Sequence, residues 1–388
     1  MSGENRIVIV GAGPAGLSAA RAYREAGGGL DVVMLAAEAH HPYSRPPLTK
    51  EYLRSEHGRA DLFMEEPGFY AEHGIDLRTR TPAARLDTAR RLVVTGDGEE
   101  LSFTGCVLAT GSQPLRLPVP GGDHEDLLTV RELEDSERLQ AQAAPGAAVT
   151  VVGSGFIGCE AAVSIATRGA SVTLVSDEEA PQSARLGEEV GTVIAGWLEQ
   201  AGVRTRFDAK VESFEENGRC VVTAGEQIRG DVTVVATGVS PRIGLAEEAG
   251  IAIEEGRVRT DASMRTSAEG VFAAGDIAFA QNPVAGRRLA VEHWGEALAH
   301  GEVAGNVLAG QAARWEQAPG FWSAIGEHTL KYAAWGDGHD EVRFESDDDG
   351  SFTAWYGREG VLVGVLTHER DDDYERGREL VESGAQLP

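Results

Sequence analysis

Two glycine runs are the residues of this sequence whose types and spacing most clearly indicate chemistry. They are Gly11-Ala-Gly13-Pro-Ala-Gly16 and Gly153-Ser-Gly155-Phe-Ile-Gly158, and both have the spacing GxGxxG. The first glycine of such a run permits a tight turn, the second lets a pyrophosphate approach the backbone, and the third packs a helix on a strand. The N-terminus of that helix offers free N–H groups and positive potential to the phosphates. Each run therefore predicts a dinucleotide-binding site.

The elements around the two runs also repeat. Each run follows an apolar strand, over 6–10 and 149–152, and opens an alanine-rich helix that ends in glycine. A second apolar strand follows each helix, over 31–35 and 171–175. A single GxGxxG occurs in many ordinary turns. Two copies in strand–helix–strand units predict an α/β fold with two Rossmann-type domains.

Three further strands end in glycine turns, over 103–111, 231–238 and 270–276, where the backbone can approach a ligand. After about residue 317 tryptophans and alternating strands predict a small separate domain. The proline- and glycine-rich segment 118–130 predicts the crossing into the second unit, and the return is expected near Pro241. We therefore expect a discontinuous first domain (1–113 and 241–316), a second domain (114–240) and a C-terminal domain (317–388).

Composition and charge argue against several classes of function. The net charge of −27 does not suit a partner such as nucleic acid or an anionic membrane. No apolar run reaches the roughly 18 residues of a membrane helix, and the first strand begins too early for a signal peptide, so we expect a cytoplasmic protein. Cys106, Cys159 and Cys220 form no CxxC pair. They predict small buried side chains, with neither a disulfide nor a metal site.

The second strand of the second unit ends where a nicotinamide nucleotide would be selected. An acidic side chain at this place binds a ribose 2′-hydroxyl and repels a 2′-phosphate. Ser176 occupies the expected place of the acid, Asp177 follows directly, and Arg185 is the nearest following arginine. The pattern favours NADH over NADPH.

Six motifs together resemble the FAD-dependent ferredoxin reductases of oxygenase systems. They are GAGPAG, YSRPPLTK about thirty residues later, ATGSQPLRLP, VVGSGFIGCE, VFAAGD and FWS. The resemblance covers nearly the whole chain and is weakest after Phe321. It implies a glutathione-reductase-like fold of two nested Rossmann-type domains, with FAD in the first and NADH in the second, and a small α+β C-terminal domain.

The resemblance also implies contacts for both dinucleotides. Glu38 or Ala37 would hold the adenosine side of FAD; alanine is a departure, because the family often has an acid there. Ala83 would lie near the adenine, and Arg45 and Lys50 would contact the flavin half. The other implied FAD contacts are Gly11, Gly13, Pro14, Ala15, Gly16, Ala109, Thr110, Gly111, Arg131, Gly275, Asp276, Glu292, His293 and Trp294. The implied NAD contacts are Gly153, Gly155, Phe156, Ile157, Gly158, Glu160, Ser176, Asp177, Ala236, Thr237 and Gly238.

Lys50 and Glu160 are the catalytic pair that the resemblance implies. The wider flavin disulfide-reductase family places such a lysine and glutamate together close to flavin N5. A paired ammonium and carboxylate would hold each other charged in a partly dry site and stabilise negative charge on the reduced flavin. The alternative is a surface lysine and an ordinary helical acid.

The stretch from Val32 to Leu62 contains no cysteine, whereas the disulfide reductases have a redox CxxxxC after the first glycine run. Without a thiol relay, FAD would be the last internal carrier. We therefore expect hydride transfer from NADH to FAD, and then single-electron transfer to a [2Fe-2S] ferredoxin that serves an oxygenase or cytochrome P450.

Other readings remain open. The acceptor could instead be rubredoxin, oxygen or a small molecule. A signalling flavoprotein of the apoptosis-inducing-factor type ranks last, because it predicts a basic surface, a targeting segment and long insertions. Small ferredoxins are usually acidic, so a reductase at −27 needs a local basic patch, for which Arg287-Arg288 and Arg85, Arg90 and Arg91 are candidates. The sequence leaves monomer and homodimer open.

Two features of the C-terminal part also allow expectations. The acidic runs 347–349 and 371–373 predict solvated loops. Phe321 and Trp322 suit a core position, whereas the resemblance suggests that Trp322 lies near the flavin edge.

Overall fold

The computed structural model describes residues 5–388, and its first unit is built on a parallel sheet. The strand order is β19-β7-β1-β2-β3, and all neighbours are parallel. The strands are β1 (Arg6–Val10), β2 (Asp31–Leu35), β3 (Ile75–Arg78), β7 (Gly105–Leu108) and β19 (Val271–Ala273). The first glycine run connects β1 to helix α1 (Pro14–Glu25), which leads to β2, so the predicted strand–helix–strand unit is present.

Helices and a small antiparallel sheet cover the two faces of this first sheet. Helix α8 (Trp294–Leu308) packs closely on α1 through Gly301 and Gly305. A Cβ at either glycine would lie only 2.2–2.3 Å from a backbone oxygen of α1. On the other face, Leu86, Val93 and Leu101 pack against apolar residues of β1 and β2. They belong to the strands β4 (Ala83–Asp87), β5 (Leu92–Thr95) and β6 (Glu100–Ser102).

The second unit repeats this arrangement. Its parallel sheet has the order β11-β10-β9-β15, with β9 (Ala148–Val152), β10 (Ser171–Val175), β11 (Arg204–Arg206) and β15 (Val232–Val235). Helix α4 (Phe156–Thr167) joins β9 to β10, and α6 (Glu188–Gln200) follows the short α5 (Ser183–Leu186). An antiparallel sheet of β12 (Val211–Glu215), β13 (Cys220–Thr223) and β14 (Gln227–Arg229) packs on apolar ends of β9, β10 and β15.

A two-stranded ribbon connects the two units. Strand β8 (Ser112–Pro114) leads away from the first sheet, and β16 (Val239–Pro241) returns antiparallel to it. The expected domain limits at 113/114 and 240/241 fall in these two strands. We propose the ribbon as the two-way crossing between the domains, rather than the later segment 118–130. Helix α3 (Leu133–Gln142) lies on the path into the second unit.

The remaining elements of the first unit surround its sheet. A four-stranded sheet contains β17 (Ile253–Glu254), β18 (Arg257–Thr260), β20 (Ala278–Asn282) and β21 (Arg287–Ala290). The short helical turns are η1 (Pro46–Thr49), η2 (Arg59–Leu62), α2 (Phe69–Glu72), α7 (Gly244–Glu248) and η3 (Gly275–Ile277).

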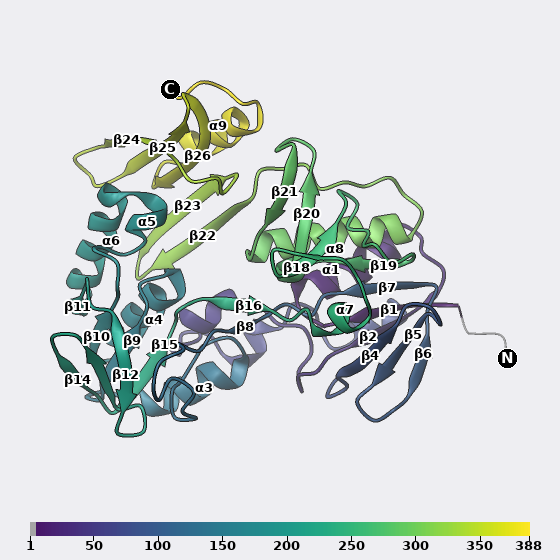
Figure 1. Cartoon of the computed structure of the whole chain (residues 1–388), viewed down its shortest axis with the longest axis horizontal. Helices are drawn as coiled ribbons and strands as arrows, with labels where there is room; N and C mark the ends of the chain where they lie inside the picture. The colour runs from purple at the N-terminus through teal and green to yellow at the C-terminus, as the bar shows by residue number, and fades with distance from the viewer. Residues whose placement is uncertain (1–4) are drawn as a thin grey trace.

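The C-terminal part is an antiparallel sheet with one helix, above the second unit in Figure 1. Its order is β22-β23-β26-β25-β24, with β22 (Gly320–Ile325), β23 (His328–Ala334), β24 (Glu341–Ser346), β25 (Phe352–Arg358), β26 (Val361–His368) and helix α9 (Asp371–Glu382). The His328 ring stacks on Trp197 of α6 at 4.4 Å, and Ile325 and Leu330 share a core with α4. The predicted α/β class with a small C-terminal domain is confirmed.

The structure corrects one local expectation. The acidic run 371–373 is not a loop but the first turn of α9. Carboxylates are favourable there, because they face the positive end of the helix dipole. Among residues 5–388, no helix has the length and apolar composition that crossing a membrane requires.

Candidate active site

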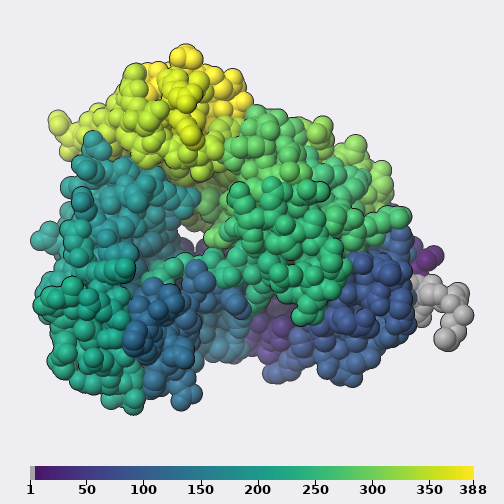
Figure 2. Space-filling model, in the orientation of Figure 1, coloured from purple at the N-terminus to yellow at the C-terminus, as the bar shows by residue number. Residues whose placement is uncertain are grey.

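A cavity of about 760 Å³ runs between the two glycine-rich units and reaches the C-terminal sheet. Figure 2 shows the molecule hollowed between the teal second unit and the green part of the first. The predicted FAD residues that line it are Gly11, Gly13, Pro14, Ala15, Ala37, Glu38, Arg45, Lys50, Ala83, Ala109, Thr110, Gly111, Arg131, Gly275, Asp276, Glu292, His293 and Trp294. The predicted NAD residues that line it are Gly155, Phe156, Ile157, Glu160, Ala236 and Gly238.

The first glycine run shapes one end of the cavity. Gly11 has φ +109°, and a Cβ there would lie 2.1 Å from the Ala109 carbonyl oxygen. A Cβ on Gly16 would lie 2.0 Å from the Gly11 carbonyl oxygen, which explains why Gly16 packs beneath the cavity instead of lining it. A Cβ on Gly13 would meet nothing within 4 Å. Gly11 and Gly16 are therefore required by packing, and Gly13 keeps space open at the N-terminus of α1.

The second glycine run has the same geometry. Gly153 has φ +105°, and its Cβ would lie 2.4 Å from the Ala236 carbonyl oxygen. Gly158 would clash with the Gly153 carbonyl oxygen at 2.0 Å. The second turn thus packs just beyond the end of β15, as the first turn packs just beyond the end of β7. The N-terminus of helix α4 lies at the cavity wall, at Gly155.

A carboxylate three residues after β2 organises the end of the cavity where the adenosine side of FAD is expected. Glu38 forms an ion pair with Arg45 at 2.5 Å and accepts a hydrogen bond from the Tyr43 hydroxyl. Burial and the Glu38 carboxylate raise the pKa of Tyr43. Arg45 also donates to the Arg131 carbonyl oxygen at 2.6 Å. Glu38 is therefore fixed at the cavity, while Ala37 offers no polar group there.

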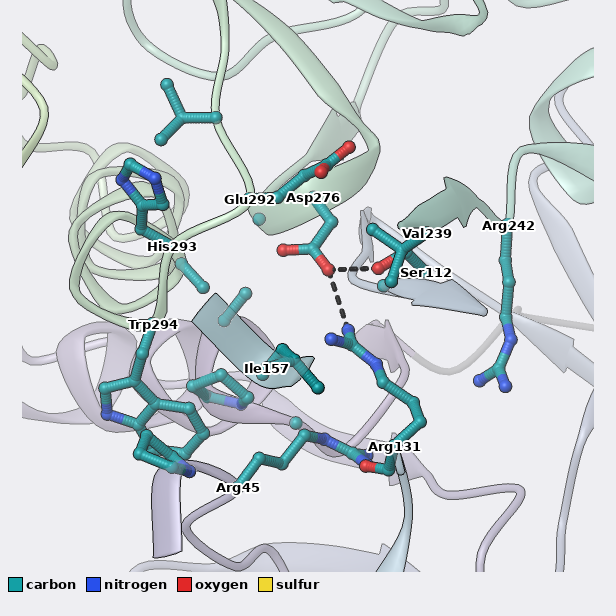
Figure 3. A pocket seen from close by; sticks show the side chains of 18 of the residues that line it. Arg45, Ser112, Arg131, Ile157, Val239, Arg242, Asp276, Glu292, His293 and Trp294 are labelled. Carbon is teal, nitrogen blue, oxygen red and sulfur yellow. Dashed lines mark hydrogen bonds and ion pairs between the residues drawn. The ribbon is translucent and has the colours of Figure 1, made fainter. Parts of the chain in front are cut away.

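A second carboxylate lies at the N-terminal turn of η3. Asp276 Oδ2 accepts hydrogen bonds from Ser112 Oγ at 2.5 Å and from Arg131 Nη2 at 2.7 Å, as Figure 3 shows. Ser112 begins β8, and Arg131 precedes α3. This group therefore joins two points on the outgoing path of the chain, β8 and the segment before α3, to the floor of the cavity.

Aromatic side chains close the far end of the cavity. His293 lies 4.4 Å from Phe321 of β22, and Phe321 lies 4.9 Å from Phe156 of α4. Burial, followed by the nearby Arg185 guanidinium, lowers the pKa of His293 to about 3, so its imidazole is neutral at physiological pH. Arg185 itself lies over the Phe321 and Tyr332 rings, at 5.5 and 5.6 Å.

Lys50 and Glu160 meet at the wall of the cavity. Lys50 Nζ lies 3.0 Å from Glu160 Oε2, and their side chains are only 7% and 4% exposed. Thr49 Oγ1 donates to the same carboxylate oxygen at 2.6 Å. Ser323 Oγ donates to Oε1 at 2.7 Å. The expected pair is thus in contact and buried, and Lys50 is not a surface lysine; its effect on the chemistry stays a prediction.

Ser176 and Asp177, which were expected to select the nucleotide, lie outside the cavity lining. Ser176 is 5% exposed, and its hydroxyl shares a hydrogen bond with the Ser154 hydroxyl at 2.7 Å. Asp177 is exposed. Because Ser176 is turned into the protein, Asp177 is the better candidate for a ribose contact. Arg185 points toward the aromatic end of the cavity.

The three cysteines are buried and free, as expected for small apolar side chains. Burial raises the pKa of Cys106 to about 12 and also raises that of Cys159. Neither thiol can therefore be a thiolate at neutral pH.

The five arginines considered as a basic docking patch all have acidic partners. The pairs are Arg85–Asp87, Arg90–Glu100, Arg91–Glu269, Arg287–Asp337 and Arg288–Glu254. Their charge is locally compensated. They do not form a patch of uncompensated positive charge.

The cavity fits a flavin dinucleotide on three observations. It is long and passes the open space at Gly13 at the N-terminus of α1, which suits a pyrophosphate. The end where adenosine is expected carries the Glu38 carboxylate, whose oxygens suit ribose hydroxyls as hydrogen-bond acceptors. At its other end the Nδ1 atom of His293 is buried without a hydrogen-bond partner within residues 5–388. The donor set therefore suits FAD.

Sequence reasoning missed several side chains that complete the site. Tyr43 and Thr49 lie within the quoted motif YSRPPLTK, and Ser323 lies within FWS. Ser112 follows the Ala-Thr-Gly turn directly. The motifs contained these residues, but the partners of Thr49, Ser112 and Ser323 lie 111 to 164 positions away in the sequence. The local sequence pattern therefore could not predict these contacts.

Comparisons with known proteins agree with the architecture. Residues 5–301 match the family model of pyridine nucleotide-disulphide oxidoreductases, and residues 320–388 match a model described as reductase C-terminal. Apoptosis-inducing factor 3 of Homo sapiens is 31% identical over 99% of this chain, which spans 64% of that protein's length. The ferredoxin–NAD(+) reductase component of the biphenyl dioxygenase system of Paraburkholderia xenovorans is 32% identical to this chain. The alignment covers 88% of this chain and 84% of that protein.

A solved structure is also closely similar. The crystal structure of the covalent putidaredoxin reductase–putidaredoxin complex superposes with a TM-score of 0.93 at 26% identity, over 99% of this chain and 94% of that one. The resemblance to ferredoxin reductases that the six motifs indicated is thereby confirmed.

Proposed function

Because the chain belongs to the pyridine nucleotide-disulphide oxidoreductase family, we propose that it is an NADH-dependent flavoprotein reductase that delivers electrons to a [2Fe-2S] ferredoxin of an oxygenase or cytochrome P450 system. The observation that carries the proposal is the buried Lys50–Glu160 pair. It lies at the cavity wall, where the first unit faces helix α4 of the second. A charged pair at this junction suits electron transfer between two dinucleotides, because it can stabilise negative charge that develops there.

The residues of the first unit would hold FAD. The N–H groups at the start of α1, beside Gly13, would bind the pyrophosphate, and Glu38 would accept from the adenosine ribose. Asp276 and Arg131 would bind the ribityl and phosphate groups, and part of the ion pair between these two side chains would then be replaced by contacts to FAD. Neutral His293 and Trp294 would cover the isoalloxazine. Bound FAD would supply the ability to take two electrons from a nicotinamide and release them one at a time.

The residues of the second unit would bind the nicotinamide nucleotide. The N-terminus of α4 at Gly155 would bind its pyrophosphate, and Phe156 and Ile157 would contact it along the cavity. We propose NADH over NADPH, because the exposed Asp177 at the end of β10 would repel a 2′-phosphate. The Lys50 ammonium, held by Glu160, would face negative charge at the boundary of the two sites.

The ferredoxin acceptor has support from the relatives. The biphenyl dioxygenase component is named a ferredoxin–NAD(+) reductase, and the similar solved structure contains putidaredoxin. Within residues 32–62 no cysteine could relay electrons, so transfer would be direct from the cofactor to the partner.

One observation favours a second candidate acceptor. The five arginines that could have attracted an acidic ferredoxin are paired with acids, and the net charge is −27. Electrostatic attraction to an acidic protein would therefore be weak. The alternative is a reductase of rubredoxin, oxygen or a small molecule, and the charge argument favours oxygen or a small molecule, because neither needs a basic docking patch.

The test is anaerobic reduction by NADH and by NADPH, followed by addition of candidate ferredoxins with cytochrome c as the final acceptor. We expect faster bleaching of the flavin absorbance with NADH, and ferredoxin-dependent reduction of cytochrome c. Rapid bleaching without ferredoxin-dependent turnover would favour the second candidate. Failure of both nucleotides to bleach the flavin would overturn the reductase assignment.

A further inference from the structure

The buried carboxylate of Glu160 collects hydrogen-bond donors from two other parts of the chain. On Oε2 it accepts from Lys50 Nζ at 3.0 Å and from Thr49 Oγ1 at 2.6 Å. On Oε1 it accepts from Ser323 Oγ at 2.7 Å and from the Ala324 N–H at 3.3 Å. The two carboxylate oxygens therefore have different partners: η1 and the residue after it serve one, and β22 serves the other.

The strand that serves Oε1 is itself held firmly. Ser323 is 1% exposed, and β22 pairs with β23 over its full length, with Ser323 opposite Leu330. Two residues earlier, Phe321 packs against Phe156 in the first turn of α4, the same helix that carries Glu160. Strand β22 thus contacts α4 at two points one helical turn apart. Figure 1 shows the end of this strand close to that helix.

We propose that Ser323 is a positioning residue, which fixes one oxygen of Glu160 so that the other holds the Lys50 ammonium at the cavity wall. The inference rests on the proposed function, in which Lys50 acts on the bound cofactor. The C-terminal sheet would then contribute to the redox centre through the Ser323 hydroxyl, in addition to covering the cavity.

The physical reason is the freedom of the carboxylate. Without the Ser323 hydroxyl, Oε1 keeps only the long contact to the Ala324 N–H, and the carboxylate can rotate about its last bond. The Lys50 ammonium then has a less fixed partner. A positive charge near a flavin stabilises its reduced, negatively charged form. Loosening that charge makes the flavin harder to reduce.

The experiment compares Ser323→Ala with the intact protein loaded with FAD. We expect the rate constant for flavin reduction at saturating NADH to fall about three- to tenfold, with the half-saturating NADH concentration changed less than about twofold. We also expect a more negative midpoint potential of the bound flavin, measured by dye-coupled titration without any nucleotide. Ser323→Thr keeps the hydroxyl and should restore both values.

A matched control is Thr353→Val, because Thr353 is fully buried in the same sheet and donates to Asp373 at 2.7 Å, away from the cavity. This variant loses a similar hydroxyl–carboxylate contact and should keep the flavin potential. If Ser323→Ala does not load FAD, Ser323→Cys provides a weaker donor of similar size and should give intermediate values. An unchanged potential and rate in Ser323→Ala or Ser323→Cys, while Lys50→Met slows reduction, would overturn this inference alone. No effect of Lys50→Met would instead count against the proposed role of the pair.

Discussion

Lys50 Nζ lies 3.0 Å from Glu160 Oε2, although the two residues are 110 positions apart and belong to different glycine-rich units. Each is nearly inaccessible to solvent, and an ion pair in such a place is costly to form unless its geometry and hydrogen bonding are good. The additional donors on Glu160 meet that condition. The contact is therefore a built feature of the interface between the units, and it motivates the first prediction.

Lys50→Met should slow reduction of the flavin by NADH at least about tenfold, because it removes a positive charge where negative charge develops. Stopped-flow absorbance under anaerobic conditions measures this rate. Lys210→Met is the matched control, since Lys210 is exposed on the second unit. Equal rates in Lys50→Met and the unmodified protein would contradict the role of the pair.

Gly13→Val should abolish FAD binding while leaving the fold intact. A Cβ at Gly13 would meet no surrounding atom within 4 Å, so a valine there would project into the space at the N-terminus of α1 where the pyrophosphate is expected. The ratio of flavin to protein after purification should fall at least about tenfold, with the far-ultraviolet circular dichroism preserved. Gly29→Val is the control, because Gly29 is exposed beyond α1 and its Cβ would also be free. Normal flavin content in Gly13→Val would place the pyrophosphate elsewhere.

Asp177→Asn should weaken the preference for NADH. The neutral side chain no longer repels a 2′-phosphate, so the ratio of kcat/KM for NADH to that for NADPH should fall about threefold or more. Glu179→Gln removes a neighbouring exposed charge and serves as the control. If both variants change the ratio equally, a general surface charge determines the preference rather than Asp177.

Acid should destabilise the protein through His300, which is fully buried beside Trp315. Burial lowers the pKa of His300 from 6.5 to about 4, so the unfolded chain binds the proton more readily than the folded one. The stability contribution is complete above about pH 6.5 and is lost as the pH falls toward 4. At pH 5 the loss is about 2 kcal/mol.

Urea unfolding at pH 7.5 and at pH 5.0 measures this term. His300→Gln removes the titrating ring, so the difference between the two pH values should shrink by about 2 kcal/mol relative to the unmodified protein. His57→Gln changes an exposed histidine and should leave the difference unchanged. An undiminished difference in His300→Gln would assign the acid sensitivity to other groups.

Local sequence was sufficient to predict the parts of the fold that short-range geometry dictates. Gly11 and Gly153 must have positive φ and must approach a neighbouring strand, and these demands leave a readable spacing. The helices α1 and α4 follow directly from it. The run Asp371–Asp373 was misread because acidic residues suit both a solvated loop and the first turn of a helix. Only the apolar spacing that follows distinguishes the two.

Contacts between segments that are distant in the sequence could not be predicted in the same way. The motif FWS was visible, but nothing near Ser323 in sequence indicates that its hydroxyl reaches Glu160, 163 positions away. The arginines 85, 90, 91, 287 and 288 suggested a basic surface when counted alone. Their compensation by acids depends on side-chain placement, as for Arg91 and Glu269. Charge complementarity is therefore a property of the folded surface and not of the composition.

The ribbon of β8 and β16 has a consequence for engineering. Pro114 and Val239 face each other across this ribbon. The chain therefore leaves the first unit and returns to it at adjacent points. Insertions are best tolerated where the two ends of the inserted segment lie close together. The intervening residues form a cassette: a two-residue turn could close the ribbon after its removal, and a different nucleotide-binding cassette could be grafted at the same junction.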